Sequence, residues 1–453
     1  MNIVSYRGPG MAGGLSNAIS RVWEKSGNSY NWWFVADNVL SVAYSKDKTA
    51  DALLSVDQEI INGHYQYCND FLWPVMHDLP AYATYRVADR KNYKAFNRLF
   101  APAVLKTASN QLDQGCFIHD YQLAGMPLLL YKDGNCRSTL FWHIPWPKKI
   151  EESHVLPIVD IVRPMLYAGT IGFHTQEYAD NFMAFVEQNV TDFKGDLRSK
   201  VIAAPLGIDF EHWAHLADQQ EKEYLQVFMG KTPTILSVDR ADFTKGVSNR
   251  MQAIDLFFRM YPEWKEKVRF LQVCGRTRAG IEVFDNYWVE CRQLARCVNN
   301  EWQTDDWRPI TWLDQPLNSA ELSVLYRNSD VMLVNPIRDG LNLTAKEFVA
   351  CQNGTNNSPG VLALSPGAGA WAELSDGCVA VDPRQPGQMA EAINSALSIS
   401  KIERGMRMQL LTKAVKANSL DKWWQKFANL LADKKLVAPT FSSDQSRYVE
   451  LAG

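Results

Sequence analysis

Two cations and a glycine directly follow an apolar run near the middle of the chain, in residues 237–246 (SVDRADFTKG). Phosphate oxygens are bound by fixed positive charge together with backbone N–H donors, so Arg240 and Lys245 at this place are typical of one edge of an anion site. A solvated loop, in which Asp239 and Asp242 are the partners of the two cations, accounts for the same residues. Taken by itself, this stretch favours neither interpretation.

A glycine cluster near the start of the chain is a second candidate for phosphate chemistry. Residues 8–14 (GPGMAGG) match GxGxxG after a predicted strand, and Asp37 after the next apolar run fits the acid that a dinucleotide-binding fold requires. Arg7, directly before the glycines, is better suited to gripping a separate anionic ligand, with the N–H of Gly14 near the start of a helix predicted over 15–25. A dehydrogenase site, a phosphate-binding turn and a simple tight turn remain open.

Two histidines stand at the ends of predicted strands in the first half of the chain. His119 and Asp120 close the strand predicted over 116–119, and His143 closes the one predicted over 139–143. Site residues of open α/β sheets gather at the carboxyl ends of strands. A single histidine is more often a hydrogen-bonded structural residue, but two at strand ends favour a site.

Residues 335–347 (NPIRDGLNLTAKE) are typical of a strand, a charged turn with glycine, and a helix. The N–H groups at the start of such a helix can hold hydroxyls or phosphate, and Glu347, about one turn in, can accept from a ribose diol. Alternatively, Asp339 caps the helix and Glu347 pairs with Lys346 or with solvent.

The elements that would position these residues alternate between short apolar runs and longer amphipathic stretches. This pattern predicts parallel strands joined by crossover helices, and hence an α/β fold with two doubly wound halves. The predicted strands are 2–5, 31–36, 116–119, 139–143, 170–173 and 201–204 in the first half, and 234–238, 268–273, 310–312, 331–334, 361–364 and 378–381 in the second.

The polar, helix-like stretch 210–231 separates the two series of strands. We therefore expect an N-terminal domain over 1–222, a C-terminal domain over 223–434 and a tail over 435–453. Within these, residues 352–359 (QNGTNNSP) predict a loop, and residues 420–431 predict a packed terminal helix, with Trp and Phe at helical spacing.

Composition excludes several classes of protein. Lys and Arg number 47 against 50 Asp and Glu, which argues against binding along a nucleic acid. The chain shows neither a leader pattern nor a long apolar segment, so we expect a cytoplasmic protein without a membrane span. Eight scattered cysteines, without CxxC pairs, predict reduced thiols and no structural zinc. HExxH, GxSxG and Walker A patterns are absent.

The sequence motifs described above, in their order along the chain, resemble those of the trehalose-6-phosphate synthase family, glycosyltransferase family 20. The resemblance covers most of the chain and is carried by Arg7 with 13–15 (GGL), 69–74 (NDFLWP), 119–121 (HDY), 143–147 (HIPWP), 172–175 (GFHT), 239–246 (DRADFTKG) and 338–347. It implies a pair of Rossmann-like domains of the GT-B type that face each other across a cleft holding the active site.

The resemblance also implies the reaction and the site residues. A hexose, with glucose as the leading candidate, would pass with retention from a nucleotide-diphosphate sugar to a phosphorylated sugar or polyol, without metal or other cofactor. The donor would be bound by Gly14, Arg240, Lys245, Asp339, Leu341, Asn342, Leu343 and Glu347, and the acceptor by Arg7, His64, Trp73, Asp120 and Arg278, with His143, Asp120, Arg240 and Lys245 in the catalytic step.

Departures from the family pattern keep the acceptor open. His64 stands where the family has an acceptor-binding Tyr, with Tyr65 and Tyr67 as alternative sources of a hydroxyl. Glucose 6-phosphate, giving trehalose 6-phosphate, is the leading acceptor; glucosylglycerol-phosphate and validoxylamine-phosphate synthases share the framework with other acceptors. A non-catalytic sugar-phosphate sensor is the alternative of another class. The donor base (UDP, GDP or ADP) and the oligomeric state, homo-oligomer included, are not determined by the sequence.

Overall fold

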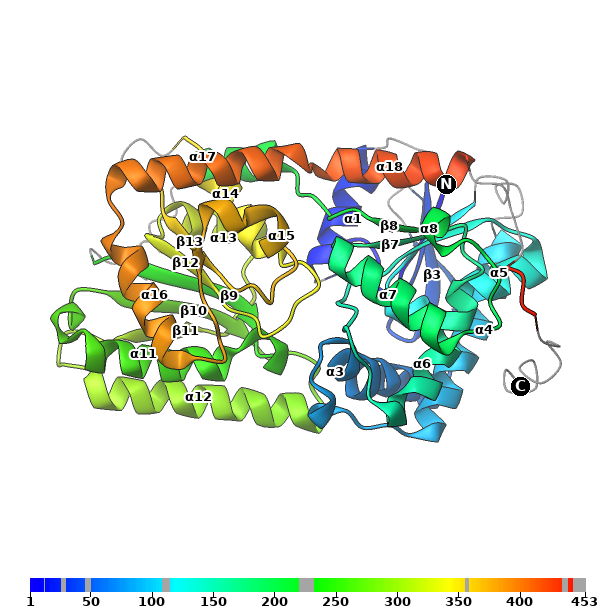
Figure 1. Ribbon diagram of the computed structural model, residues 1–453, viewed down its shortest axis with the longest axis horizontal. Helices are drawn as coiled ribbons and strands as arrows, with labels where there is room; N and C mark the ends of the chain where they lie inside the picture. The colour runs from blue at the N-terminus through cyan, green and yellow to red at the C-terminus, as the bar shows by residue number, and fades with distance from the viewer. Residues whose placement is uncertain are drawn as a thin grey trace. The chain divides into compact units, whose positions relative to one another are not determined.

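The computed structural model describes residues 1–11, 13–25, 30–44, 50–107, 115–219, 232–354, 358–433 and 439–442. The chain forms two compact units, Met1–Leu206 with Leu420–Gly453, and Gly207–Ser419. Each is built on its own largely or wholly parallel sheet with helices on both faces (Figure 1). The predicted α/β class with two doubly wound halves is confirmed.

The N-terminal unit has a sheet in the order β4-β3-β2-β1-β5-β6-β7-β8. Its strands are β1 (Asn2–Val4), β2 (Asn31–Ala36), β3 (Val39–Tyr44), β4 (Ala50–Ser55), β5 (Cys116–His119), β6 (Ser138–Phe141), β7 (Thr170–Phe173) and β8 (Val201–Ala203). Along the sheet from β2 through β1, β5, β6 and β7 to β8, neighbouring strands are parallel, whereas β3 is antiparallel to both β2 and β4. Every residue of β1, β5, β6 and β7 is buried, as expected for parallel strands covered on both faces.

Helices cover this sheet in two layers. They are α1 (Gly14–Lys25), α2 (Gln58–Gln66), the π-helix η1 (Tyr67–Leu72), α3 (Trp73–Met76), η2 (Pro80–Tyr82), α4 (Val87–Thr107), η4 (Tyr121–Leu123), α5 (Met126–Gly134), α6 (Glu152–Met165), α7 (Gln176–Asn189), α8 (Leu197–Lys200) and α18 (Leu420–Asp433). α1 packs with α18, while α2, α4, α5 and α6 pack in sequence with one another.

The C-terminal unit has a wholly parallel sheet in the order β11-β10-β9-β12-β13-β14. Its strands are β9 (Thr234–Arg240), β10 (Arg269–Gly275), β11 (Ile310–Leu313), β12 (Val331–Val334), β13 (Val361–Leu364) and β14 (Val379–Ala380). Numbered within the unit, this is the 3-2-1-4-5-6 order of a Rossmann fold. The sheet therefore reverses its winding between β9 and β12.

The helices of this unit also form two layers (Figure 1). They are α9 (Phe210–Gln219), η5 (Phe243–Lys245), α11 (Val247–Met260), η6 (Pro262–Trp264), α12 (Glu282–Trp302), α13 (Ser319–Arg327), α14 (Leu343–Cys351), α15 (Trp371–Leu374), η7 (Ser375–Gly377), α16 (Pro386–Ser398) and α17 (Lys401–Ala417). α11 packs with α12 and α16, and α14 packs with α9, α13 and α17.

The last helix lies on a different unit from the one that the sequence indicated. α18, within the predicted C-terminal domain 223–434, packs on the N-terminal sheet: Phe427 stacks on Phe117 with ring centroids 5.3 Å apart, and Trp423 contacts Phe141 at 5.0 Å. These large apolar rings find their burial on the first sheet, so the chain crosses back after Ser419. The first boundary falls at Leu206 rather than at residue 222.

Several predicted segments fall partly outside the described residues. The predicted stretch 210–231, the loop 352–359 and the tail 435–453 are described only in part. The residues outside the description include 220–231, 355–357, 434–438 and 443–453. Within the tail, Phe441 forms an isolated bridge with Phe193 of the N-terminal unit.

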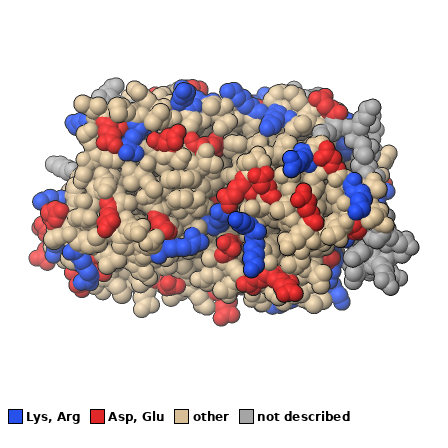
Figure 2. Space-filling model, viewed as in Figure 1, with Lys and Arg blue, Asp and Glu red and all other residues tan. Residues whose placement is uncertain are grey.

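The surface carries mixed charge. On the face shown in Figure 2, positive and negative residues are interspersed, in keeping with the net charge of -3. Within the part of the chain that the structure describes, the helices are too short or too polar to cross a bilayer.

Candidate active site

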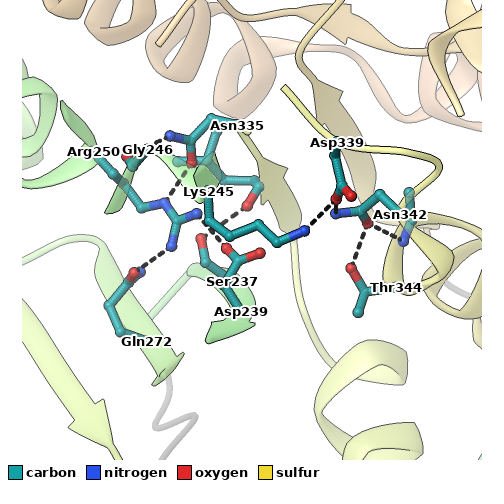
Figure 3. A network of polar contacts seen from close by, with 12 residues as sticks. Ser237, Asp239, Lys245, Gly246, Arg250, Gln272, Asn335, Asp339, Asn342 and Thr344 are labelled. Atoms are coloured by element: carbon teal, nitrogen blue, oxygen red, sulfur yellow. Dashed lines mark hydrogen bonds and ion pairs between the residues drawn. The ribbon is translucent and has the colours of Figure 1, made fainter. Parts of the chain in front are cut away.

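The point where the C-terminal sheet reverses its winding brings two predicted site residues together. In open α/β sheets, the loops after the two central strands part at this point and leave a crevice at their carboxyl ends. Lys245 lies in η5 after β9, and Asp339 lies in the loop after β12. Their side chains meet, with Lys245 Nζ 2.5 Å from Asp339 Oδ2, although 94 residues separate them (Figure 3).

This ion pair is nearly closed off from water. The two side chains are each 11% exposed. Asn342 Nδ2 donates to the same Oδ2 atom of Asp339 at 3.1 Å. The Lys245 ammonium is therefore fixed at the carboxyl edge of the sheet, and the alternative of a solvated loop is wrong for Lys245.

Asn342 also determines how α14 begins. It has a φ of 82°, and its side chain accepts from the N–H of Ala345 at 3.2 Å and from the hydroxyl of Thr344 at 2.7 Å. Asn tolerates this left-handed conformation better than most residues. Asn342 is therefore the cap that the alternative interpretation assigned to Asp339, and that alternative is wrong. Leu341 and Leu343 flank Asn342 in the chain, and Leu341 is buried.

Glu347 lies about one turn into α14, as predicted. The hydroxyl of Tyr326 donates to its Oε2 at 3.2 Å, and burial raises the pKa of Glu347 to about 7. Lys346 instead pairs with Glu373, with Nζ 2.6 Å from Oε1. The alternative pairing of Glu347 with Lys346 is therefore wrong.

A buried arginine holds the strands behind the site. Arg250 on α11 is fully buried and donates to Asp239 at 2.5 Å, to Asn335 at 2.5 Å and to Gln272 at 2.7 Å (Figure 3). These contacts join β9, β10 and the residue after β12. Gly246 precedes the first residue of α11. A glycine is needed there because φ is +64° and a Cβ would lie 2.7 Å from the carbonyl oxygen of Asn335.

Asp242, the second acid of residues 237–246, also has an arginine partner. Asp242 is fully buried; its Oδ2 lies 2.6 Å from Nη1 of Arg278, and its Oδ1 caps η5. Arg278 has a φ of 47°, and its guanidinium lies 4.8 Å from the centroid of the Phe284 ring. Arg240, at the end of β9, is exposed. The structure thus places Arg278 beside the 237–246 stretch, a proximity that the sequence analysis did not predict.

The N-terminal unit has its own reversal point, between β1 and β5. The exposed Arg7 follows β1, and its Nη1 would lie 3.3 Å from a Cβ at Gly13, so the guanidinium lies against the glycine turn. α1 begins at Gly14, as expected for a phosphate-binding turn. Asp37, with a φ of 48°, instead lies in a tight turn joining β2 to the antiparallel β3, which does not favour the dehydrogenase interpretation.

Asp120 links the ends of β5 and β6. Its Oδ1 accepts from the N–H of Tyr121 at 3.0 Å and from the N–H of His143 at 3.1 Å. A φ of 75° is strained for an aspartate, and such strain persists where the surroundings over-determine it. The structure thus joins two residues that the sequence singled out separately.

Two predicted acceptor residues lie in the adjoining helical segment. Trp73, which follows the π-helix η1, is 6% exposed, and its ring lies 4.0 Å from that of His77. His64 is fully buried: its ring stacks on Tyr93 at 5.4 Å, and its Nε2 lies 3.0 Å from the carbonyl oxygen of Gln122. Burial lowers the pKa of His64 to about 4. These contacts are structural and argue against a direct contact with a ligand.

Comparison with known proteins identifies the family. The model of glycosyltransferase family 20 matches residues 25–433. The chain belongs to glycosyltransferase family 20. The predicted resemblance is confirmed, as is the prediction of a glycosyltransferase.

Relatives and solved structures agree with this assignment. The chain is 31% identical over 406 residues to the alpha,alpha-trehalose-phosphate synthase [UDP-forming] of Botryotinia fuckeliana, covering 85% of this chain and 76% of the relative. It is 32% identical over 396 residues to a bifunctional trehalose-6-phosphate synthase/phosphatase of Thermoproteus tenax, covering 84% of this chain and 53% of that protein. The chain thus spans about half the length of the latter.

One similar crystal structure contains a sugar phosphate. It is an alpha,alpha-trehalose-phosphate synthase (UDP-forming) from Burkholderia xenovorans in complex with glucose-6-phosphate. It superposes with a TM-score of 0.86 at 26% identity, covering 95% of this chain and 99% of that chain. The two share the GT-B fold.

Proposed function

We propose that this protein transfers glucose from UDP-glucose to glucose 6-phosphate, giving trehalose 6-phosphate and UDP. The observation that carries this proposal is the Lys245–Asp339 pair, with Glu347 on the following helix, at the reversal point of a Rossmann sheet in a family 20 chain. The names of the relatives above support UDP as the leaving group, and the Burkholderia xenovorans complex supports glucose 6-phosphate as the acceptor.

The C-terminal unit would hold the donor. Arg240 and Lys245 supply the positive charge that a diphosphate needs as its bond to the sugar breaks. Glu347, when ionised, accepts from the ribose hydroxyls, while Asp339 and the backbone N–H groups of Leu341, Asn342 and Leu343 hold the transferred glucose and the diphosphate. In the N-terminal unit, the N–H of Gly14 adds a donor at the start of α1.

Each unit, taken by itself, carries residues proposed for the acceptor. Arg7 and Arg278 carry the charge for its phosphate, and Trp73 offers a flat apolar surface to its ring. Asp120 is held by two backbone N–H groups and is suited to accept from sugar hydroxyls. We do not include His64 among these contacts, because it is fully buried.

The proposed chemistry is a displacement on one face of the glucose ring. The bond from C1 to the diphosphate breaks, the acceptor hydroxyl oxygen bonds to C1, and the hydroxyl proton leaves on the diphosphate oxygen. UDP-glucose is an α-glycoside, and an α,α-linked product keeps that configuration at C1. The protein stabilises the departing diphosphate through fixed cations, an electrostatic effect worth about 2.7–4 kcal/mol for each preorganised donor. We propose that no metal is needed, because Arg240 and Lys245 carry the neutralising charge.

We place the reaction in the cytoplasm. The eight cysteines are free thiols, seven of them buried, which fits a reducing compartment. The other acceptors and the sensor considered from the sequence are not favoured by the relatives, which are named as trehalose-phosphate synthases.

A crossed substrate panel tests this function. Purified protein is supplied with UDP-, GDP- or ADP-glucose and with glucose 6-phosphate, glycerol 3-phosphate or glucose, and nucleotide release is followed. We expect release of UDP that depends on glucose 6-phosphate. Release confined to glycerol 3-phosphate would transfer the proposal to a different synthase, and binding of the donor without release in any combination would indicate a sensor.

A further inference from the structure

Three histidines form a continuous chain across the carboxyl edge of the N-terminal sheet. His119 closes β5, His143 follows β6 and His174 follows β7. His119 Nδ1 lies 3.2 Å from His143 Nε2, and His143 Nδ1 lies 3.3 Å from His174 Nε2. At the far end, the backbone N–H of Leu206, after β8, donates to His174 Nδ1 at 3.3 Å.

The Leu206 end determines where every ring proton lies. A backbone N–H can only donate, so Nδ1 of His174 carries no proton and a neutral His174 carries it on Nε2. That proton points at Nδ1 of His143, which must accept, so His143 is protonated on Nε2. The same step places the proton of His119 on Nε2. All three neutral rings are therefore Nε2–H tautomers.

The row of three histidines has no place for a fourth proton. Each ring-to-ring contact takes one proton, and Nδ1 of His174 takes none. A further proton on any of the three rings would set two N–H groups against each other. Among the described residues, the chain ends at His119 Nε2, which is buried without a hydrogen-bond partner, and the rings of Phe117 and Trp423 lie next to this imidazole.

The surroundings also favour the neutral form. His119 and His174 are 0% and 4% exposed. Burial lowers the pKa of His119 to about 3, and burial with the neighbouring His174 and His119 lowers that of His143 well below its usual value. The elements packed around His143 present His119 from β5, His174 from β7, Phe141 from β6 and Trp423 from α18; its backbone N–H meets the carboxylate of Asp120.

We propose that His174 is a positioning residue that, together with the N–H of Leu206, fixes His143 as a neutral Nε2–H imidazole at the edge of the sheet. Both ring nitrogens of His143 are then engaged by the neighbouring histidines, His119 and His174. His143 therefore acts as an oriented neutral group and not as a general acid or base. The same contacts hold the His143 backbone N–H against Asp120. The kinetic part of this proposal rests on the proposed function, whereas the tautomer assignment does not.

The tautomers can be measured directly in the full chain. Two-bond proton–nitrogen correlation spectra of protein labelled with ¹⁵N-histidine distinguish Nδ1–H, Nε2–H and imidazolium rings, and single variants assign the signals. We expect His119, His143 and His174 to be Nε2–H tautomers from pH 8 down to pH 6. An Nδ1–H tautomer or an imidazolium at any of the three positions in this range would overturn the proposal.

Two substitutions at His174 separate orientation from bulk. His174→Gln places an amide Nε2 where the imidazole Nε2 lies, so it can still donate to His143, whereas His174→Phe fills the space without a donor. We expect the glutamine variant to keep His143 as Nε2–H. In the phenylalanine variant, both His143 tautomers should become populated, and kcat should fall by about tenfold, by analogy with the loss of a residue that orients a metal-binding histidine.

The controls keep the outcomes distinct. His154→Gln changes a histidine on α6 that is not one of the three hydrogen-bonded histidines, and it should leave the three signals and kcat unchanged. Unaltered tautomers and an unaltered pH profile of kcat in His174→Phe would overturn the positioning role. If no substrate pair reacts, the proposed function fails while the spectra still decide the tautomers. If His174→Phe does not fold, the wild-type and His174→Gln spectra decide.

Discussion

In the C-terminal unit, the residues at the reversal of the sheet are held by charge: Lys245 pairs with Asp339, and Arg250 pairs with Asp239. In the N-terminal unit, the carboxyl ends of β5, β6 and β7 are held by neutral imidazoles and by backbone N–H groups around Asp120. A diphosphate leaving group needs cations, and cations in a buried place need carboxylates to stay there. The hydroxyls of the proposed acceptor need oriented hydrogen-bond partners, for which neutral groups suffice, and only its phosphate needs cations.

The largest loss of activity is expected when the Lys245 cation is removed from the C-terminal unit. We expect Lys245→Ala to lower kcat by about 10²–10³-fold or more, because the departing diphosphate loses a preorganised positive group. Steady-state UDP release measures the loss. Lys413→Ala, at an exposed lysine on α17, is the matched control and should retain wild-type kcat. A Lys245→Ala enzyme with near-normal turnover would contradict the diphosphate assignment.

Removing the supporting arginine should affect stability instead. Arg250→Met leaves the Asp239 carboxylate buried without its partner, so we expect a loss of about 3–5 kcal/mol in the free energy of unfolding. Denaturant titration measures it. Arg259→Met breaks an exposed pair with Asp255 on the same helix and should leave the free energy of unfolding nearly unchanged. Equal effects of the two substitutions would show that the buried network is not what holds the strands.

Acid should weaken donor binding through Glu347. With a pKa of about 7, this carboxyl is largely protonated at pH 6 and ionised at pH 8, and only the ionised form accepts from both ribose hydroxyls. We expect the donor KM to rise about tenfold between pH 8 and pH 6, in proportion to the lost ionised fraction. Glu347→Gln should raise the donor KM and remove this pH dependence. A wild-type donor KM that does not vary with pH would refute the ribose role.

An effect on stability alone, and none on the proposed substrate contacts, is expected at the buried His64. Its folded-state pKa of about 4 lies below the unfolded value, so its contribution to stability is fully present above about pH 6.5 and is lost as the pH falls toward 4. Between pH 6.5 and 5 the loss is about 2 kcal/mol. His64→Phe should reduce this acid sensitivity relative to the wild type, whereas His215→Gln, at an exposed histidine, should not. Equal slopes for all three proteins would argue against a neutral buried His64.

Much of the fold could be predicted from the sequence, because buried parallel strands are continuous apolar runs. The ranges 31–36, 116–119, 170–173, 331–334 and 361–364 were predicted to the residue. β3 and β4 were missed. β4 is mostly exposed, so its side chains show no buried face for periodicity to reveal.

The site was predictable where it follows strands and less so where it depends on contacts between distant elements. Lys245, Asp339 and Glu347 were marked by glycines and by charged turns after strands. Arg250 sits within an amphipathic helix, where an arginine normally indicates a solvated face, so nothing local indicates a buried network. The role of His174 was also missed, because its partners His143 and Leu206 come from neighbouring strands 31 and 32 residues away.

The glycosidic linkage of the product decides whether the protein makes trehalose 6-phosphate. UDP-glucose and ¹³C-labelled glucose 6-phosphate are incubated with the protein, and the product is analysed by NMR. We expect an α,α-1,1 linkage between the two glucose units, with the phosphate retained on the acceptor. A β configuration at the transferred C1, or a linkage to any other hydroxyl, would contradict it.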